Sequence, residues 1–517
     1  MMGSIQNFIR SPTTLLILSL IVWTTSPLVV EARVHHHKWE VKYQFKSPDC
    51  FQKLAVTING MTPGPTIYAR QGDTVVVEVK NSLFTENVAI HWHGIRQIGT
   101  PWSDGTEGVT QCPIVPGDTF TYKFVVDRAG TYIYHAHYGM QRSAGLNGMI
   151  IVSVPDGVTE PFSYDYDRSI LLNDWWHKST YEQAAGLNSV PFVWIGEPQG
   201  HSMTIVEADG NYVEPFVVKN LNIYSGETYS VIVKADQDSS RNYWAALNVI
   251  TRKPGTPTGL GIINYYPNSP KKSPPTVPPS GPIWNDTTYF LRQSQAIKAR
   301  QGYVIPPPPT SDRVITLLNT QNKIDGRIKW ALNNMSFTLP DTPYLVALKQ
   351  RLHHVFNQKP APETYDSKNF DVFGVAKNAN ATSGNSIYRL KFNSTVDIIL
   401  QNANTMTVNN SETHPWHLHG HDFWVLGHGI GKFDPMNDPK KYNLVDPIMK
   451  NTVPLHRYGW TALRFRADNP GVWAFHCHIE AHFFMGMGVV FEEGVEKVGR
   501  LPSSIMGCGE TKRFLRH

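Results

Sequence analysis

Residues 476–487 read HCHIEAHFFMGM, which places one cysteine among histidines and methionines. Two imidazoles, a thiolate and a long axial thioether form a blue copper site, and Cys477, His482 and Met487 supply three of these four ligands. Because side chains alternate along a strand, the two histidines that flank Cys477 are expected to point to the opposite face. The sequence therefore predicts a second metal centre that Cys477 connects covalently to the first.

Three further histidine clusters indicate where that second centre gets its ligands. Residues 91–94 read HWHG, residues 135–137 read HAH and residues 414–421 read HPWHLHGH. In an H-x-H pair the two side chains leave a strand on the same face, so both can reach one cluster of metals. The four pairs supply eight imidazoles, enough for three copper ions: His91, His93, His135, His137, His417, His419, His476 and His478. His414 is left over and completes the blue site.

Two simpler interpretations compete with copper. A single H-x-H pair is more often a surface or hydrogen-bonded pair than a ligand pair. Four pairs, one of them centred on a cysteine with a histidine and a methionine at suitable spacing, argue against that interpretation. A structural zinc site also uses imidazole and thiolate, but it closes with four ligands and has no use for eight further histidines.

Composition predicts an all-β protein with more than one domain. At 517 residues the chain is too long for one hydrophobic core, so two to four domains are expected. Its 39 Gly, 37 Pro and 11% aromatic residues are typical of short strands and many turns. Residues 74–79, 121–126 and 229–233 are rich in β-branched and aromatic side chains, as strands are. A sandwich or barrel class follows, and the clearest helix candidate is residues 344–356.

Residues 1–32 are predicted to be a secretory signal peptide. Arg10 precedes an apolar run at 15–23, and residues 30–32 are similar to a small-residue cleavage site. The apolar run is shorter than the ~20 residues that a membrane span needs, so no stable membrane anchor is expected. A secreted, extracellular or cell-wall protein with sugars on Asn-x-Ser/Thr acceptors follows, and the acceptors are Asn285, Asn334, Asn380, Asn393 and Asn409.

With these motifs the chain resembles the multicopper oxidases, and among them the plant ascorbate oxidases, over nearly all of its mature length. The resemblance implies three cupredoxin-like domains, which are Greek-key β-sandwiches, and four copper ions. It implies type 1 ligands His414, Cys477, His482 and Met487, and type 2 ligands His91 and His417. It implies type 3 ligands His93, His135, His137, His419, His476 and His478.

Proline-rich stretches of the chain guide the expected domain limits. Domain 1 is expected at residues 33–154, domain 2 at 155–310 and domain 3 at 311–517. Two proline-rich stretches, 267–282 and 306–309, are typical of extended connectors rather than packed structure. Each outer domain then contributes two H-x-H pairs to a cluster at their interface.

The second domain is predicted to be truncated near residues 199–204. After a segment like 191–199 the family runs through several strands before a segment like 205–211, and here five residues stand between the two. We interpret this as the loss of a block on the order of half a sandwich domain of ~100 residues. All proposed copper ligands lie outside domain 2, so the loss threatens stability more than ligation.

The cysteine count is odd once Cys477 is set aside as a ligand. Three cysteines remain, and three cannot all pair in an oxidising compartment. The resemblance implies a disulfide between Cys112 and Cys508. Cys50 is then unpaired, because its usual partner belongs to the missing block.

The resemblance also implies an activity. A small-molecule reductant gives single electrons at an exposed edge of His414 or His482, Cys477 passes them on, and four of them reduce dioxygen to water. Asp104 is similar to the family's proton-relaying acid, and the alternative is a turn residue before glycine. Glu480 is a second candidate for proton transfer or tuning.

The donor is harder to predict. Axial Met487 keeps the copper potential low, which favours an easily oxidised donor such as ascorbate over a phenol. By family likeness the substrate contacts are Trp194, Trp330, Arg252 and Glu412. The net charge of +5 weakly suits an anionic substrate, and the chain has no clustered basic run of the kind that binds nucleic acid.

Three alternatives to an ascorbate oxidase stay open at this point. The first is a laccase-like oxidase of phenols or monolignols. The second is an inactive truncated isoform, and the third is a non-catalytic cell-wall protein on the same fold. The oligomeric state also stays open, with a homodimer as one alternative.

Overall fold

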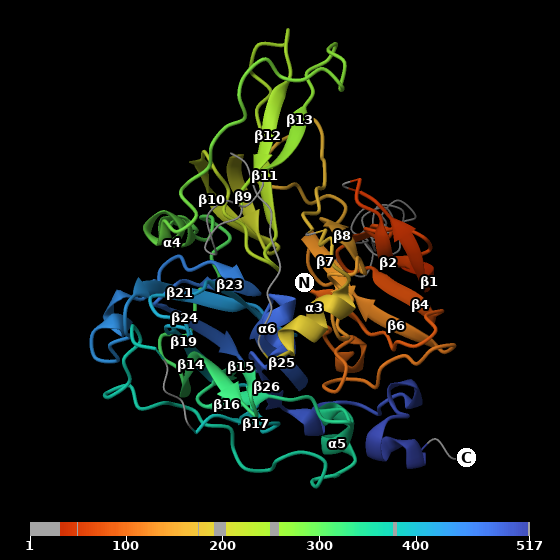
Figure 1. Ribbon diagram of the computed structural model, residues 1–517, viewed down its shortest axis with the longest axis vertical. Coiled ribbons are helices and arrows are strands. Elements are labelled where there is room, and N and C mark those ends of the chain that lie inside the picture. The colour runs from red at the N-terminus through yellow and green to blue at the C-terminus, as the bar shows by residue number, and fades with distance from the viewer. Residues whose placement is uncertain are drawn as a thin grey trace, which may run out of the picture.

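The computed structural model describes residues 32–48, 50–173, 175–190, 203–248, 258–375 and 380–514. These residues form several β-sheets with short helices between them, which confirms the prediction of an all-β protein (Figure 1). Among them, no helix is both long and apolar enough to cross a membrane. The signal peptide prediction falls on residues 1–32, which lie outside the described part except for the last one.

Two four-stranded sheets form the amino-terminal part. One has the order β2 (Lys53–Ile58), β1 (Val34–Lys46), β4 (Thr74–Asn81), β6 (Thr119–Val125). The other has the order β3 (Ile67–Arg70), β8 (Asn147–Ser153), β7 (Gly130–Ala136), β5 (Ile90–His93). In β6 the buried side chains are Phe120, Tyr122 and Phe124, at every second position. This alternation gives the sheet one face toward the core and one toward solvent.

Two small sheets form the middle part. One has the order β10 (Asn211–Val218), β9 (Met203–Ala208), β11 (Tyr229–Ile232). The other pairs β12 (Tyr243–Leu247) with β13 (Gly259–Ile263) and projects at the top of the molecule (Figure 1). Helices α3 (Thr180–Leu187) and α4 (Thr287–Ala296) belong to this part, and each begins after a side-chain cap, Ser179 or Asp286.

The carboxyl-terminal part packs an eight-stranded sheet with a five-stranded one. The larger has the order β17 (Thr382–Gly384), β16 (Met335–Phe337), β15 (Arg327–Leu332), β14 (Arg313–Ile324), β19 (Thr395–Asn402), β24 (Gly459–Arg466), β21 (Phe423–Ile430), β22 (Met449–Lys450). The smaller has the order β18 (Tyr388–Leu390), β26 (Gly488–Glu493), β25 (Gly471–Cys477), β20 (His414–Leu418), β23 (Thr452–Leu455). Ile205, Ala208 and Val213 of the middle part share the hydrophobic core of these sheets.

The helices differ from the prediction. The expected helix at 344–356 is shorter, because α5 ends at Lys349 (Tyr344–Lys349). Arg351 has φ 57°, a left-handed conformation that a helix cannot continue through. The prediction missed α3, α4 and the short α6 (Glu480–Phe484), which lies between the amino-terminal and carboxyl-terminal sheets (Figure 1).

A disulfide joins the amino-terminal part of the fold to the carboxyl-terminal tail. It links Cys112 to Cys508 across 396 residues of sequence, and it is the pair that the resemblance implied. The tail continues this contact, because the Cys112 N–H donates to the carbonyl of Ile505 (3.0 Å). Cys50 is exposed and outside any disulfide of the described residues, as predicted.

Candidate metal centres

Strand pairing places two of the four H-x-H pairs side by side in the amino-terminal part and the other two side by side in the carboxyl-terminal part. In the amino-terminal part β5 pairs with β7 so that His91 lies opposite His135. In the carboxyl-terminal part β20 pairs with β25 so that His417 lies opposite His476. Seven of the eight histidines are buried and His137 is half-buried. The two parts of the fold therefore present their histidines toward a shared interior.

The eight histidines fall into three groups of three, one member being shared. Within each group the ring nitrogens lie within 4.8 Å of one another. The groups are His91, His93 and His417; His93, His135 and His478; and His137, His419 and His476. Every group takes members from both parts of the fold. Such a site exists only when the two parts meet.

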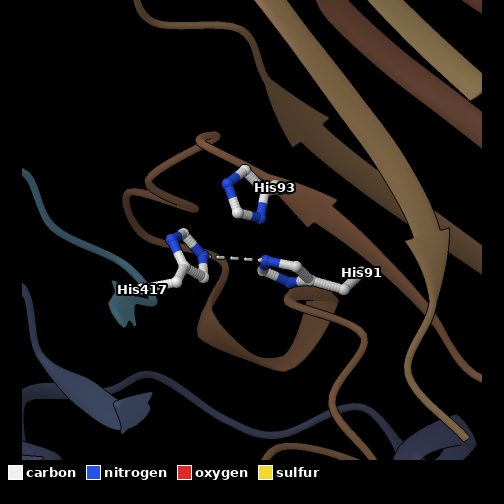
Figure 2. A group of neighbouring side chains, drawn as sticks. All are labelled: His91, His93 and His417. Atoms are coloured by element: carbon white, nitrogen blue, oxygen red, sulfur yellow. Dashed lines mark hydrogen bonds between the residues drawn. The ribbon is translucent and has the colours of Figure 1, made fainter. Parts of the chain in front are cut away.

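Short distances between ring nitrogens show how closely these groups converge. Figure 2 shows His91 and His417 facing each other from separate strands, with 3.4 Å between their Nε2 atoms. The Nε2 atoms of His135 and His478 are 3.1 Å apart. In the third group, the Nε2 atoms of His419 and His476 are 3.0 Å apart. Each pair joins two imidazole nitrogens that one metal ion can bridge.

Burial lowers the pKa of seven of these eight imidazoles and so favours their neutral form. Desolvation lowers the pKa of His476 to about 3. Desolvation, followed by the repulsion of neighbouring charges, lowers the pKa well below 6.5 for His93, His135, His137, His417, His419 and His478. Neutral imidazole is the form that binds a metal ion, so the cluster is ready to ligate at neutral pH.

The outward ring nitrogens have oxygen partners, as metal-binding histidines usually do. The Nδ1 atoms of four histidines lie within hydrogen-bonding distance of backbone carbonyls. These contacts are His91 to Asp104 (2.8 Å), His135 to Ala136 (2.9 Å), His417 to Asn451 (2.9 Å) and His476 to Cys477 (2.9 Å). Since each Nδ1 donates to a carbonyl, each Nε2 is left with a lone pair that points into the cluster.

His93 has the opposite orientation. Its Nε2 lies 3.1 Å from the hydroxyl of Thr452. Its Nδ1 is buried and has no hydrogen-bond partner among the described residues. An orphaned imidazole nitrogen in this place is costly unless a metal ion uses it. The donor set therefore fits copper, which imidazole suits well.

A separate group surrounds the cysteine. The Cys477 Sγ lies 3.8 Å from His414 Nδ1 and 3.6 Å from His482 Nδ1, and these two nitrogens are 3.1 Å apart. Met487 is fully buried in the same hydrophobic core, and its carbonyl accepts the Cys477 N–H (3.1 Å). The structure thus places the predicted two imidazoles, thiolate and thioether in one buried region.

Asp104 lies directly behind the histidine cluster and is fully buried. Its Oδ2 is 3.0 Å from His419 Nδ1 and accepts the Thr106 hydroxyl (2.6 Å), and its Oδ1 is 3.3 Å from His91 Nδ1. It also precedes a tight turn, because a Cβ on Gly105 (φ +82°) would lie 1.7 Å from the Ile90 carbonyl oxygen. Asp104 therefore contacts two histidines of the cluster and also precedes Gly105 at a bend, and its role in proton relay stays a prediction.

A cavity of about 290 Å³ opens onto the cluster. Its lining includes His135, His137, His476, His478, Glu107 and Glu480. The Glu480 carboxylate accepts the backbone N–H groups of Arg142 (3.0 Å) and Ser143 (2.9 Å), so it clamps α6 to the amino-terminal part. Burial raises the pKa of Glu107 to about 7.

The predicted substrate contacts are found only in part. Trp330 packs its ring on His414 (centroids 4.8 Å apart) and on His482 (5.1 Å), and Glu412 Oε2 is 3.3 Å from His482 Nε2. Trp194 and Arg252 lie outside the described residues. The expected exposed edge is absent in this structure, because His414 is 0% and His482 2% exposed. Trp330 and Glu412 lie against these rings.

Three contacts of the cluster have no signal in the sequence. Asn451 and Thr452 hold outward nitrogens of His417 and His93. Arg142 Nη1 lies 2.7 Å from His478 Nδ1, and its Nη2 donates to the carbonyl of His478 (2.7 Å). These residues carry no motif and become neighbours of the cluster only through the tertiary fold.

Comparison with known proteins agrees with this geometry. Sequence profiles of the multicopper oxidases match residues 40–157, 185–268 and 354–497. The chain is 49% identical to an L-ascorbate oxidase of Nicotiana tabacum, with 97% of each chain covered. The chain belongs to the multicopper oxidase family. It is therefore a copper oxidoreductase with dioxygen as the electron acceptor.

Other multicopper oxidases are similar at lower identity. Laccase-11 of Arabidopsis thaliana is 33% identical over 89% of this chain and 92% of its own. The crystal structure of Fet3p, a multicopper oxidase that functions in iron import, is 25% identical and superposes with a TM-score of 0.74 over 92% of this chain and 94% of that one. The cupredoxin-like multicopper oxidase fold is confirmed by this superposition.

The alignment with the Nicotiana tabacum relative also contains gaps. It extends over 566 positions, whereas 97% of the 517 residues is about 501. About 65 positions (566 minus 501) therefore have no residue from this multicopper oxidase.

Proposed function

We propose that this chain is a secreted ascorbate oxidase that couples one-electron oxidation of ascorbate to the four-electron reduction of dioxygen to water. The observation that carries the proposal is the adjacency of two sites: Cys477 lies in one group, and the histidines before and after it lie in the other groups. Copper, when bound, would supply one-electron oxidation at the cysteine site, and the four ions of the two sites together would store the four electrons.

The ligand assignment follows the grouping. Type 1 copper is assigned to His414, Cys477, His482 and Met487, and type 2 copper to His91 and His417. The type 3 pair is assigned to His93, His135 and His478 on one side and to His137, His419 and His476 on the other. Two histidine triads, one facing histidine pair and the cysteine group support four ions in total.

Two acids are placed to serve the oxygen chemistry. Asp104 contacts the outward nitrogen of His419 and accepts the Thr106 hydroxyl, so it can hold a proton next to the cluster. Glu480 lines the cavity, and its carboxylate accepts the backbone N–H groups of Arg142 and Ser143. We assign proton relay to Asp104 and a tuning and clamping role to Glu480.

Ascorbate is the proposed donor. The relative at 49% identity is named L-ascorbate oxidase, and the one at 33% is named a laccase. Trp330 and Glu412 lie against the ring of His482, and we include both in the proposed contact set for an enediol donor. Trp194 and Arg252 complete the proposed contact set.

Secretion has two supports in the described residues. All five glycosylation acceptors are exposed: Asn285, Asn334, Asn380, Asn393 and Asn409. The disulfide between Cys112 and Cys508 is typical of an oxidising compartment. We propose an extracellular or cell-wall glycoprotein whose signal peptide is residues 1–32.

The domain limits 33–154, 155–310 and 311–517 remain part of the proposal, with domain 2 truncated. The described residues of the middle part form five strands in two small sheets, and the alignment gaps amount to about 65 positions. Both observations support a lost block near residues 199–204.

The test is oxygen uptake by the chain secreted from a eukaryotic host in copper-containing medium. We expect a higher kcat/KM for ascorbate than for a simple phenol, and no uptake by Cys477→Ser. A preference for the phenol supports the laccase-like alternative. Copper-loaded, folded protein without uptake on either donor supports the inactive isoform or a non-catalytic wall protein.

A further inference from the structure

The middle part of the chain approaches the histidine cluster at two places: Ser225, whose hydroxyl lies 3.2 Å from His478 Nδ1, and the hairpin turn between β9 and β10. Asp209 and Gly210 connect β9 to β10, and both have positive φ (48° and 80°). Two central residues with positive φ define the tight turn that Asp-Gly favours. The Asp209 side chain is nevertheless fully buried, which is unusual for the tip of a hairpin.

The buried carboxylate holds a backbone segment next to the cluster. Asp209 Oδ2 accepts the N–H groups of Asn451 (3.3 Å) and Thr452 (3.1 Å). Its Oδ1 accepts the N–H of Thr228 (2.9 Å). Lys450 Nζ lies 3.4 Å from Oδ2, so a buried cation balances the charge. Both oxygens of the Asp209 carboxylate therefore have partners within the fold.

That backbone segment is the one that holds two of the histidines. The carbonyl of Asn451 lies 2.9 Å from His417 Nδ1. The Thr452 hydroxyl lies 3.1 Å from His417 Nδ1 and 3.1 Å from His93 Nε2. These histidines come from different parts of the fold and belong to the group drawn in Figure 2. One threonine hydroxyl therefore sets the ring orientation of both.

The hairpin is itself held firmly in place. Arg128 of the amino-terminal part donates to the carbonyl of Asp209 (3.2 Å) and to the side chain of Asn211 (3.4 Å), and it pairs with Asp422 of the carboxyl-terminal part. A Cβ on Gly210 would lie 2.2 Å from the Tyr132 hydroxyl oxygen. The turn is thus packed between both other parts, at the point where they meet.

We infer that Asp209 is a positioning residue for the histidine cluster: its carboxylate fixes Asn451 and Thr452, and these orient His93 and His417. The inference rests on the proposed copper ligation by these histidines. It also gives the shortened middle part a function, because the hairpin that reaches the cluster is retained.

The test is Asp209→Asn in the full copper-loaded chain. Asn-Gly favours the same turn as Asp-Gly, so the hairpin is kept. The charge is lost in every case, and in one of the two amide orientations the NH2 group also faces the N–H groups of Asn451 and Thr452. We expect a changed type 2 copper signal in electron paramagnetic resonance and a roughly 10-fold loss of oxygen uptake, as for other groups that orient metal ligands. The blue absorption of the Cys477 site should stay.

A matched control is Asp397→Asn. Asp397 is also buried and charged, but it pairs with Arg464 (2.6 Å) within the eight-stranded sheet. We expect a lower unfolding temperature with an unchanged type 2 signal. An Asp209→Asn protein with the wild-type type 2 signal and wild-type uptake would overturn the inference.

A second variant covers the case in which Asp209→Asn does not fold. Thr452→Val removes the hydroxyl that contacts His93 and His417 and keeps the side-chain shape. The same change in the type 2 signal is expected, and an unchanged signal and copper stoichiometry overturn the inference. If the wild-type protein itself takes up no copper, the proposed function fails instead.

Discussion

A histidine that binds a metal ion through one ring nitrogen needs a partner for the other, because that partner sets the tautomer and the ring angle. Four of the eight histidines of the cluster take a backbone carbonyl as this partner. His419 is different, since its Nδ1 meets the Asp104 carboxylate at 3.0 Å. A carboxylate raises the basicity of the ring and can also accept or return a proton.

Asp104→Asn tests this contact. The amide has the same shape but lacks the charge and the proton affinity of the carboxylate, so we expect oxygen uptake to fall by roughly 10- to 100-fold. The blue absorption should persist, because the Cys477 group does not include Asp104. Unchanged uptake in a fully copper-loaded variant would contradict the role assigned to Asp104.

At the residue scale, the sequence predicts the histidines better than their partners. An H-x-H pair is visible because a strand has a period of two, and the cysteine marks the second group. Thr452 and Asp209 have no such signal, because they approach the cluster from strand ends more than 200 positions apart in the sequence. Only the tertiary fold makes them neighbours.

Strand β9 contains the clearest pH-dependent group of the middle part. Glu207 is 3% exposed, and burial raises the pKa of its carboxyl from 4.5 to about 7. The folded state therefore holds this proton more tightly than the unfolded state. Its contribution to stability is complete below pH 4.5 and is lost as the pH rises toward about 7.

Glu207→Gln should remove the loss of stability that ionisation of Glu207 causes at high pH. A rise from 4.5 to about 7 corresponds to about 3 kcal/mol, so we expect the variant to be more stable than the wild-type protein at pH 8 by up to about that amount. Near pH 4.5 the two proteins should be similar. Urea unfolding of both proteins across this range measures the difference, and parallel pH profiles would contradict it.

At the scale of elements, strands were easier to predict than helices. The segments predicted at 74–79, 121–126 and 229–233 lie in β4, β6 and β11 almost to the residue. The helix predicted at 344–356 ends early, and α4 was missed although Asp286 caps it. Short helices between sheets depend on local caps and on packing rather than on a long periodic pattern.

At the scale of the whole molecule, the site requires two parts of the fold to stay together. Every histidine group draws on both parts, and the disulfide between Cys112 and Cys508 ties the first part to the carboxyl-terminal tail. The middle part adds its hairpin between them. Assembly of the cluster and stability of the whole fold are therefore linked.

Cys508→Ser measures how much the disulfide contributes to the free energy of unfolding. Opening a loop of 396 residues restores chain entropy to the unfolded state, so we expect a loss of roughly 2–5 kcal/mol and a lower unfolding temperature. Cys50→Ser is the matched control, because Cys50 is exposed and outside the disulfide, and it should leave the unfolding temperature unchanged. Equal effects of the two substitutions would contradict this assignment.

The way in which the middle part connects the two outer parts was the least predictable feature of the chain. By family likeness, the sequence predicts that residues 199–204 join segments that are farther apart in the relatives. It does not show that Arg128 and Asp209 connect what remains, because ion pairs and hydrogen bonds between distant segments have no local pattern.

The central claim is that this chain assembles a blue copper site next to a three-copper cluster despite its short middle part. The visible absorption spectrum of the secreted, copper-loaded protein tests it most directly. We predict an intense blue band that is absent in Cys477→Ser, because the thiolate ligand produces that colour. Folded, copper-exposed protein that stays colourless would contradict the account.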